Sequence, residues 1–189
     1  MIVPTILLYV MRMLVWKRPR RPVLYAEGDD LPAVDVMITC CGEENKIILN
    51  VVRAACESDY PTGRLRVILL DDGHNSELEK AIHFMQQDKY PFVYYTAREK
   101  PEKPDFKAGN VNHGIRFTAE MEPVAPFIAA LDTDMVVQPG WLRSMIPHLM
   151  QDEKLGMTNP PQVGPKTSQS GGSQLMFHST SITYRQTTT

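Results

Sequence analysis

Two aspartates, Asp132 and Asp134, are the side chains of this sequence best suited to chemistry. They follow an apolar segment, Pro126–Leu131, that predicts a buried strand. Where the chain bends after such a strand, both carboxylates can reach one polyanionic ligand through a divalent cation. Hard oxygen ligands of this kind suit Mg²⁺ or Mn²⁺ bound together with a phosphate. The pair alone is also what an ordinary solvated turn contains, so its meaning depends on the surrounding sequence.

Two further polar motifs can contribute to the same chemistry. Asp71–Gly73 follows the apolar segment Arg66–Leu70, where carboxylates can accept hydrogen bonds from a base or a ribose. In Lys107–Asn110, Lys107 can neutralise a phosphate and Gly109 allows close approach of the backbone to a ligand. Each motif has a simpler interpretation, because Asp and Gly favour strand-to-helix turns and a lysine at a helix start is often solvated.

The elements that must position these motifs alternate between strand and helix, which predicts an α/β fold with a mainly parallel sheet. Ligands of such sheets bind beyond the carboxyl ends of the strands, where the acidic motifs lie. A capping box, Ser76 followed by Glu79, marks one helix start. The expected strands are Val34–Cys40, Arg66–Leu70, Phe92–Thr96 and Phe127–Leu131, and the expected helices are Glu44–Glu57, Ser76–Gln87, Phe106–Thr118 and Gly140–Met150.

Composition restricts the class of protein. The 189 residues suffice for one domain with a core, and the 43% hydrophobic and 22% charged fractions are ordinary for a globular protein. A net charge of −2 gives no bulk attraction for nucleic acid, so we expect no nucleic-acid partner. The cysteines, Cys40, Cys41 and Cys56, lack the spacing of a disulfide framework or a zinc site, which favours a reducing, cytosol-facing compartment.

The two ends of the chain differ from the central domain. The segment 1–17 is almost wholly apolar from Ile2 to Trp16, interrupted by Arg12, and the basic cluster Lys17–Arg21 follows this run, as at the cytoplasmic end of a membrane helix. It is shorter than the roughly 20 residues of a spanning helix, so a buried or interfacial helix is the alternative. We expect a basic, proline-containing linker over 18–32 and a poorly ordered tail, rich in Ser, Thr, Gln and Gly, over 163–189.

Taken together, the central motifs resemble those of family 2 glycosyltransferases, especially the cellulose-synthase-like, membrane-bound processive enzymes of bacteria and fungi. The resemblance covers residues 33–162 and implies a GT-A fold, a Rossmann-like nucleotide-sugar-binding fold that is incomplete here at the C-terminus. It also implies transfer of a hexose from a UDP-sugar to a growing polysaccharide or an oligosaccharide, with Mn²⁺ or Mg²⁺, at a membrane with the catalytic domain facing the cytoplasm. The motifs are Val34–Thr39, Tyr60–Pro61, Val67–Gly73, Tyr94–Arg98, Phe106–Asn110, Ala130–Asp134 and Asn159–Gln162.

The same resemblance implies roles for individual residues. Asp132 and Asp134 would bind the metal, with Asp134 the preferred ligand, and Pro160–Gln162 would form an acceptor-side segment. Asp71 and Asp72 would contact the uridine. The complete set of donor-binding candidates is Thr39, Glu43, Asp71, Asp72, Lys107 and Asp132.

The sequence departs from the family in three places. Cys41 stands where the family often has an aromatic residue that stacks on the uracil. The sequence lacks the family's Thr-Glu-Asp motif, whose acidic residue acts as general base. It also lacks a Gln-x-x-Arg-Trp motif, because neither of its two tryptophans, Trp16 and Trp141, stands in that pattern. No catalytic residue is therefore identified. We expect the donor-binding half of a larger protein, and the alternative is a truncated, inactive nucleotide-binding fragment.

A phosphatase is a further alternative. Asp132-Thr-Asp134-Met-Val136 after an apolar strand resembles the haloacid dehalogenase signature, with Asp132 as nucleophile and Asp134 as acid or base. That signature usually lies on the first strand of its domain. Here three expected strands precede it, which disfavours this hypothesis.

Overall fold

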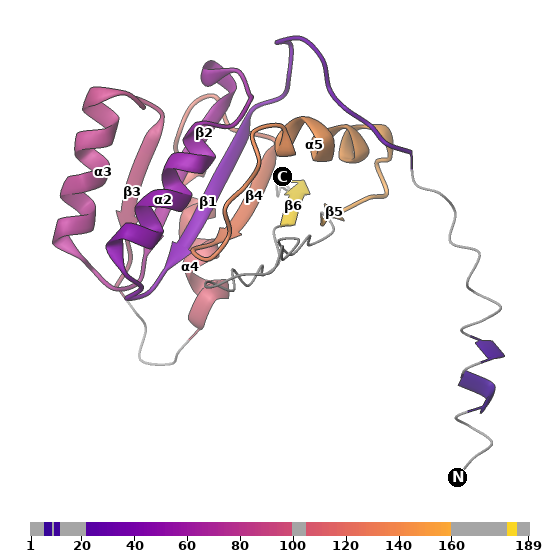
Figure 1. Ribbon diagram of the computed structural model, residues 1–189, viewed down its shortest axis with the longest axis horizontal. Coiled ribbons are helices and arrows are strands. Elements are labelled where there is room, and N and C mark those ends of the chain that lie inside the picture. The colour runs from indigo at the N-terminus through magenta and orange to yellow at the C-terminus, as the bar shows by residue number, and fades with distance from the viewer. Residues whose placement is uncertain (1–5, 9, 12–21, 100–104, 160–180, 185–189) are drawn as a thin grey trace, which may run out of the picture.

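A central sheet organises the protein in the computed structural model, which describes residues 6–8, 10–11, 22–99, 105–159 and 181–184. Within these residues the sheet has six strands in the order β3-β2-β1-β4-β6-β5 (Figure 1). The strands are β1 (Val34–Cys40), β2 (Leu65–Asp71), β3 (Val93–Ala97), β4 (Phe127–Asp132), β5 (Met157–Thr158) and β6 (Ser181–Tyr184). The helices are α2 (Asn45–Cys56), α3 (Ser76–Asp88), α4 (Phe106–Ala119) and α5 (Trp141–Gln151), with a 3₁₀ helix, η1, over Thr62–Arg64.

The core of the sheet is parallel, as the sequence predicted. Strand β1 pairs in parallel with both β2 and β4, and β2 pairs in parallel with β3. The register places Cys40 opposite Asp71 and Thr39 opposite Asp132. The polar ends of three strands therefore meet at one edge of the sheet.

Helices cover both faces of the sheet, and the parallel strands beneath them are accordingly rich in buried apolar residues. Along β1, Val36 and Ile38 contribute to the core shared with α2, α3 and α5, whereas Met37 belongs to the core under α4. In Figure 1, α4 lies behind the sheet and the other three helices lie in front. Gly114 lets α4 approach closely, because a Cβ there would lie 2.7 Å from a methyl carbon of Leu70.

The start of α3 corrects one detail of the sequence analysis. The helix begins at Ser76 as expected, but the capping residue is Asn75 and the predicted capping box does not form. The Asn75 side-chain oxygen accepts hydrogen bonds from the backbone N–H groups of Glu77 (3.0 Å) and Leu78 (3.2 Å). The capping acceptor is therefore an amide oxygen one residue before Ser76, and it satisfies two backbone donors of the first helical turn.

The C-terminal tail contains a strand that the sequence analysis did not predict. Strand β6 pairs antiparallel with β4 and with β5, so residues 181–184 extend the sheet beyond the parallel strands. Ile182 is fully buried against the core, and the strand covers an edge of β4 that would otherwise expose unpaired backbone groups. One apolar residue among polar neighbours gives too weak a pattern to identify a strand. Residues 160–180, including the expected acceptor-side segment Pro160–Gln162, lie outside the described residues.

The described part of the expected linker, residues 22–32, contacts the domain. Arg143 on α5 donates hydrogen bonds to the carbonyl oxygens of Ala26 (3.1 Å), Gly28 (2.7 Å) and Asp59 (2.9 Å). Residues near Ala26 are therefore fastened to the domain. Most of segment 1–17 lies outside the described residues. Among the helices of the described ranges, none combines the length and the apolar character needed to cross a membrane.

The contact of α4 with the sheet gives a first prediction. Gly114→Ala should lower the free energy of unfolding by about 1–2 kcal/mol, because the added methyl group overpacks against Leu70 and Met37. Urea denaturation monitored by circular dichroism measures this change. Gly63→Ala is the control, since a Cβ there meets no atom within 4 Å. Equal stability of the two variants would contradict the tight packing of α4.

Candidate functional site

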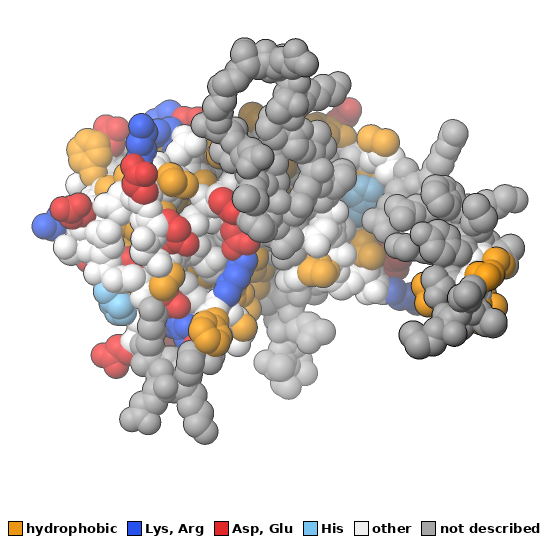
Figure 2. Space-filling model, turned by 60° about the horizontal axis from the view of Figure 1, so that its bottom comes forward, with side chains coloured by type: hydrophobic (Ala, Val, Ile, Leu, Met, Phe, Trp, Pro, Cys, Tyr) orange, Lys and Arg blue, Asp and Glu red, His pale blue; other side chains and the backbone are white. Residues whose placement is uncertain are grey.

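The candidate site lies where the order of the strands reverses. From β1 the chain continues to β2 and β3 on one side of the sheet and then returns to β4 on the other side. Crevices at the carboxyl ends of strands next to such a reversal are the usual ligand sites of open α/β sheets. Figure 2 brings this edge forward and shows acidic and basic side chains close together over it.

The aspartate pair stands on a tight turn at the end of β4. The backbone N–H of Met135 donates to the carbonyl oxygen of Asp132 at 3.1 Å, which closes the turn. Thr133 is buried between the two aspartates, whereas Asp134 is exposed and the Asp132 side chain is 27% exposed. The bend at the strand end that the sequence predicted is therefore present, and it brings both carboxylates to the surface.

Asp132 already binds a cationic group of the protein. The ammonium group of Lys107, in the first turn of α4, forms an ion pair with Asp132 Oδ1. This pairing shows that the carboxylate is placed to attract a cation, and its hard oxygen donors suit Mg²⁺ or Mn²⁺. Within the described part of the chain, no three His, Cys, Asp or Glu side chains cluster as a metal site. A divalent cation held by Asp132 and Asp134 would therefore need oxygens from a phosphate or water, an arrangement common for Mg²⁺.

Asp71 faces inward and supports the loop that follows β2. Its carboxylate is 1% exposed and accepts hydrogen bonds from Gly73 N (2.6 Å), Asn75 N (2.8 Å), the Tyr95 hydroxyl (2.8 Å) and Cys40 Sγ (3.6 Å). Burial acts to raise the pKa of Asp71, but the hydrogen bonds from Asn75, Tyr95 and Gly73 outweigh it and hold the pKa below its usual value. The ionised side chain therefore stabilises the turn between β2 and α3.

The carboxylate of Asp72 forms a buried ion pair with an arginine. Its two oxygens accept from Arg98 Nε (2.8 Å) and Nη2 (3.1 Å), and both side chains are buried. The hydrogen bond with Asp72 is the main reason that the pKa of Arg98 lies above its usual value. In the sequence, Arg98 is visible only as the last residue of the motif Tyr94–Arg98, which predicts no role for it. Its position directly after a strand, at the edge that carries the acidic motifs, is the signal that could have identified it.

The remaining candidates lie at the same edge with separate contacts. Glu43 is exposed and accepts a hydrogen bond from the backbone N–H of Cys41 at 2.6 Å. Thr39, next to Asp132 in the register, is 9% exposed. Asn110 donates from Nδ2 to the carbonyl oxygen of Leu70 at 2.9 Å, which ties α4 to the end of β2. The structure thus brings Lys107 and Asp132 into direct contact, with Thr39 opposite Asp132 in the sheet, and the other candidates lie at the ends of neighbouring strands.

The inward-facing carboxylate of Asp71 gives a prediction about pH. Its folded-state pKa is depressed, so its contribution to stability is complete above about pH 4, the usual unfolded value, and is lost as pH falls through the lower folded value. Asp71→Asn should lower the free energy of unfolding at pH 7 by roughly 1–3 kcal/mol. The new amide N–H₂ would face groups that now donate to the carboxylate, such as the N–H of Asn75 and the hydroxyl of Tyr95. The substitution should also flatten the pH dependence of unfolding below pH 4.

Urea titrations between pH 2 and pH 7 test this expectation. Asp88→Asn, at the exposed end of α3, is the matched control and should leave the pH profile unchanged. A wild-type profile retained in Asp71→Asn would show that this carboxylate does not support the loop.

Comparison with known proteins agrees with this geometry. The family model described as "Glycosyl transferase family 2" matches residues 35–188, a range that includes the tail set apart in the sequence analysis. The chain is 30% identical over 147 residues to "Cellulose synthase 2" of Novacetimonas hansenii, covering 77% of this chain and 8% of that protein. It is 31% identical over 147 residues to "Cellulose synthase catalytic subunit [UDP-forming]" of Pseudomonas fluorescens, covering 77% of this chain and 18% of that protein. The chain therefore spans less than a fifth of either relative.

Solved structures share the fold. A mannosyltransferase of Pyrobaculum calidifontis, solved in complex with GDP-Man and Mn²⁺, has a TM-score of 0.58 at 22% identity and covers 80% of this chain and 41% of its own. TarS 1–349 of S. aureus has a TM-score of 0.50 at 13% identity and covers 63% of this chain and 32% of its own. These similarities confirm the expected mainly parallel α/β fold of the GT-A type.

Proposed function

Because the chain belongs to glycosyltransferase family 2, we propose that it binds a nucleotide sugar at the carboxyl edge of its sheet. The observation that carries this proposal is the ion pair between Lys107 and Asp132, beside the exposed Asp134, at the point where the strand order reverses. When a metal-bound diphosphate arrives, the two groups can separate, so that the carboxylate of Asp132 holds the metal and the ammonium of Lys107 holds the diphosphate. UDP is the proposed nucleotide, since a relative that is 31% identical is named as UDP-forming.

We assign separate parts in donor binding to Asp132, Asp134 and Lys107. Asp132 and Asp134 would hold Mn²⁺ or Mg²⁺, which when bound supplies Lewis-acid stabilisation of the leaving diphosphate. Lys107 is half-exposed, and once it leaves Asp132 its ammonium can pair with a phosphate oxygen. The solved mannosyltransferase with GDP-Man and Mn²⁺ supports a divalent metal in this fold. Thr39, Glu43 and Asp72 line the same edge and complete the proposed donor site.

Transfer to an acceptor requires a second part of the reaction. A carboxylate near the acceptor hydroxyl must remove its proton, and none of the described carboxylates is assigned to that task. We therefore expect this chain to bind the donor and to transfer little sugar by itself. In the whole protein the proposed reaction is transfer of a hexose to a growing polysaccharide, by a membrane-associated enzyme whose catalytic domain faces the cytoplasm. Family membership favours this function over the phosphatase hypothesis.

Metal-dependent nucleotide binding is the direct test. Isothermal titration calorimetry should show binding of UDP to the 189-residue chain in the presence of Mn²⁺ and much weaker binding in EDTA. Asp134→Ala should abolish the metal-dependent part while leaving the thermal stability within about 0.5 kcal/mol of wild type, because an exposed side chain contributes little to packing. Asp88→Ala, at the exposed end of α3, is the control. Absence of metal-dependent heat in the wild-type chain would refute the proposal.

The choice of nucleotide and the extent of reaction can be measured separately. UDP should bind more tightly than GDP in competition titrations with Mn²⁺. Incubation with UDP-glucose or UDP-N-acetylglucosamine should release little free UDP, and an aryl phosphate should not be hydrolysed. Rapid release of UDP would show that the chain supplies its own general base, whereas hydrolysis of the aryl phosphate would favour a phosphatase.

A further inference from the structure

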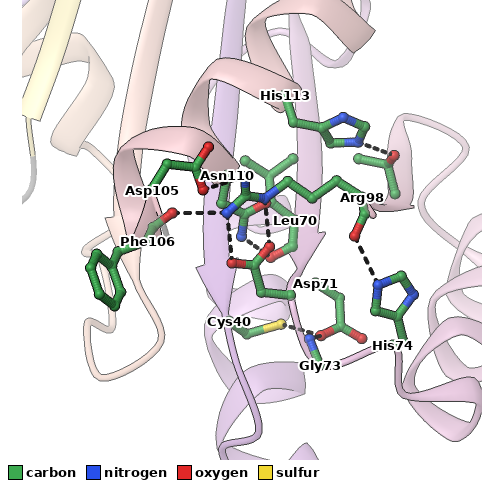
Figure 3. A network of polar contacts seen from close by, with 12 residues as sticks. Cys40, Leu70, Asp71, Gly73, His74, Arg98, Asp105, Phe106, Asn110 and His113 are labelled. Atoms are coloured by element: carbon green, nitrogen blue, oxygen red, sulfur yellow. Dashed lines mark hydrogen bonds and ion pairs between the residues drawn. The ribbon is translucent and has the colours of Figure 1, made fainter. Parts of the chain in front are cut away.

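Arg98, directly after β3, contacts the loop after β2 and the start of α4, and so joins three parts of the chain that carry the proposed site. Its guanidinium binds the Asp72 carboxylate after β2, the Asp105 carboxylate before α4 (Nη1 to Oδ1, 2.7 Å) and the Phe106 carbonyl oxygen at the start of α4 (3.0 Å). Nη2 alone donates to both Asp72 and Phe106, so these two groups lie on either side of one nitrogen. Figure 3 shows the guanidinium in the middle of this network.

The start of α4 needs such support because its backbone is strained. Phe106 has φ 44°, a left-handed conformation that is a genuine outlier for a bulky residue. Its ring is 73% exposed, so burial of the side chain does not stabilise this conformation. The hydrogen bond from Arg98 acts on the peptide group that joins Phe106 to Lys107. Backbone strain maintained by specific contacts is often associated with function.

Gly109 makes the contact between Arg98 and Asp105 possible. A Cβ at this position would overlap the carboxyl group of Asp105, so only glycine leaves room for that side chain on the first turn of α4. A glycine inside a helix is less favourable than alanine, because it loses more backbone freedom on folding. The sequence thus keeps an unfavourable helix residue where it permits the contact between Asp105 and Arg98.

We propose that Arg98 is a positioning residue that connects Asp72 to the start of α4 and thereby holds Lys107 opposite Asp132. The inference rests on the proposed function and deepens it, because Asp72 then affects binding of the diphosphate through Arg98 and Lys107. Arginine suits this position because the three nitrogens of its planar fork donate to four oxygens on three groups, whereas all the donors of a lysine lie on one nitrogen at the end of a flexible stem.

Binding of Mn²⁺-pyrophosphate, which has no base, tests this connection by calorimetry. Arg98→Lys and Asp72→Asn should each weaken pyrophosphate binding by roughly tenfold, the effect of misplacing one charged contact. If Asp72 acts only on the base, both variants bind pyrophosphate within about twofold of wild type, and the inference is overturned. Wild-type chain that binds neither UDP nor pyrophosphate would overturn the proposed function, and this inference with it.

A double-mutant cycle shows whether Arg98 acts through Lys107. In a Lys107→Met background, Arg98→Lys should change pyrophosphate affinity less than about twofold, because the group it positions is absent. If the loss of pyrophosphate affinity in the double variant equals the product of the losses in the two single variants, Arg98 acts independently of Lys107 and the proposal is contradicted.

Gly109→Ala separates positioning from stability. The variant should stay close to wild type in thermal stability, because the helix preference of alanine offsets the lost ion pair between Arg98 and Asp105, yet it should bind pyrophosphate several-fold more weakly because Asp105 is displaced from Arg98. This variant also keeps the test decisive if substitution of the buried Arg98 prevents folding. Wild-type affinity in Gly109→Ala would overturn the proposal.

Discussion

The parallel pairing of β1 with both β2 and β4 is the constraint on which the rest of the site depends. It fixes Cys40 beside Asp71 and Thr39 beside Asp132, so polar groups far apart in the sequence meet at one edge. The helices then follow from the apolar faces of the strands, and the close approach of α4 at Gly114 brings Lys107 to Asp132. A shift of one residue in either register would reverse the faces of a strand and separate these groups.

Asp71 and Asp72 illustrate how neighbouring residues of one type acquire different roles. Both carboxylates are buried, and a buried charge requires compensation. Asp71 obtains it from neutral donors, chiefly the backbone of the following turn and Tyr95. Asp72 obtains it from the guanidinium of Arg98. The first carboxylate therefore shapes a loop, whereas the second connects that loop to another element.

The sequence predicted the parallel strands and their helices because long apolar runs and their spacing report burial directly. It also predicted that the acidic motifs share one edge, since that follows from parallel topology alone. It did not predict the partners of Arg98, because the reach of a long side chain is not encoded in spacing along the chain. Strand β6 was missed for another reason: it is only four residues long and is held by pairing with β4, a contact between distant segments.

The ion pair between Lys107 and Asp132 has a consequence for the order in which ligands can bind. A divalent cation that arrives alone must displace an ammonium group and leave it without its partner. If a diphosphate arrives as well, the displaced ammonium finds a new anion, so each ligand makes the other's binding more favourable. Such mutual enhancement is thermodynamic coupling, and it is reciprocal by necessity. The lysine would thus make the site selective for the complete metal-nucleotide complex over either component alone.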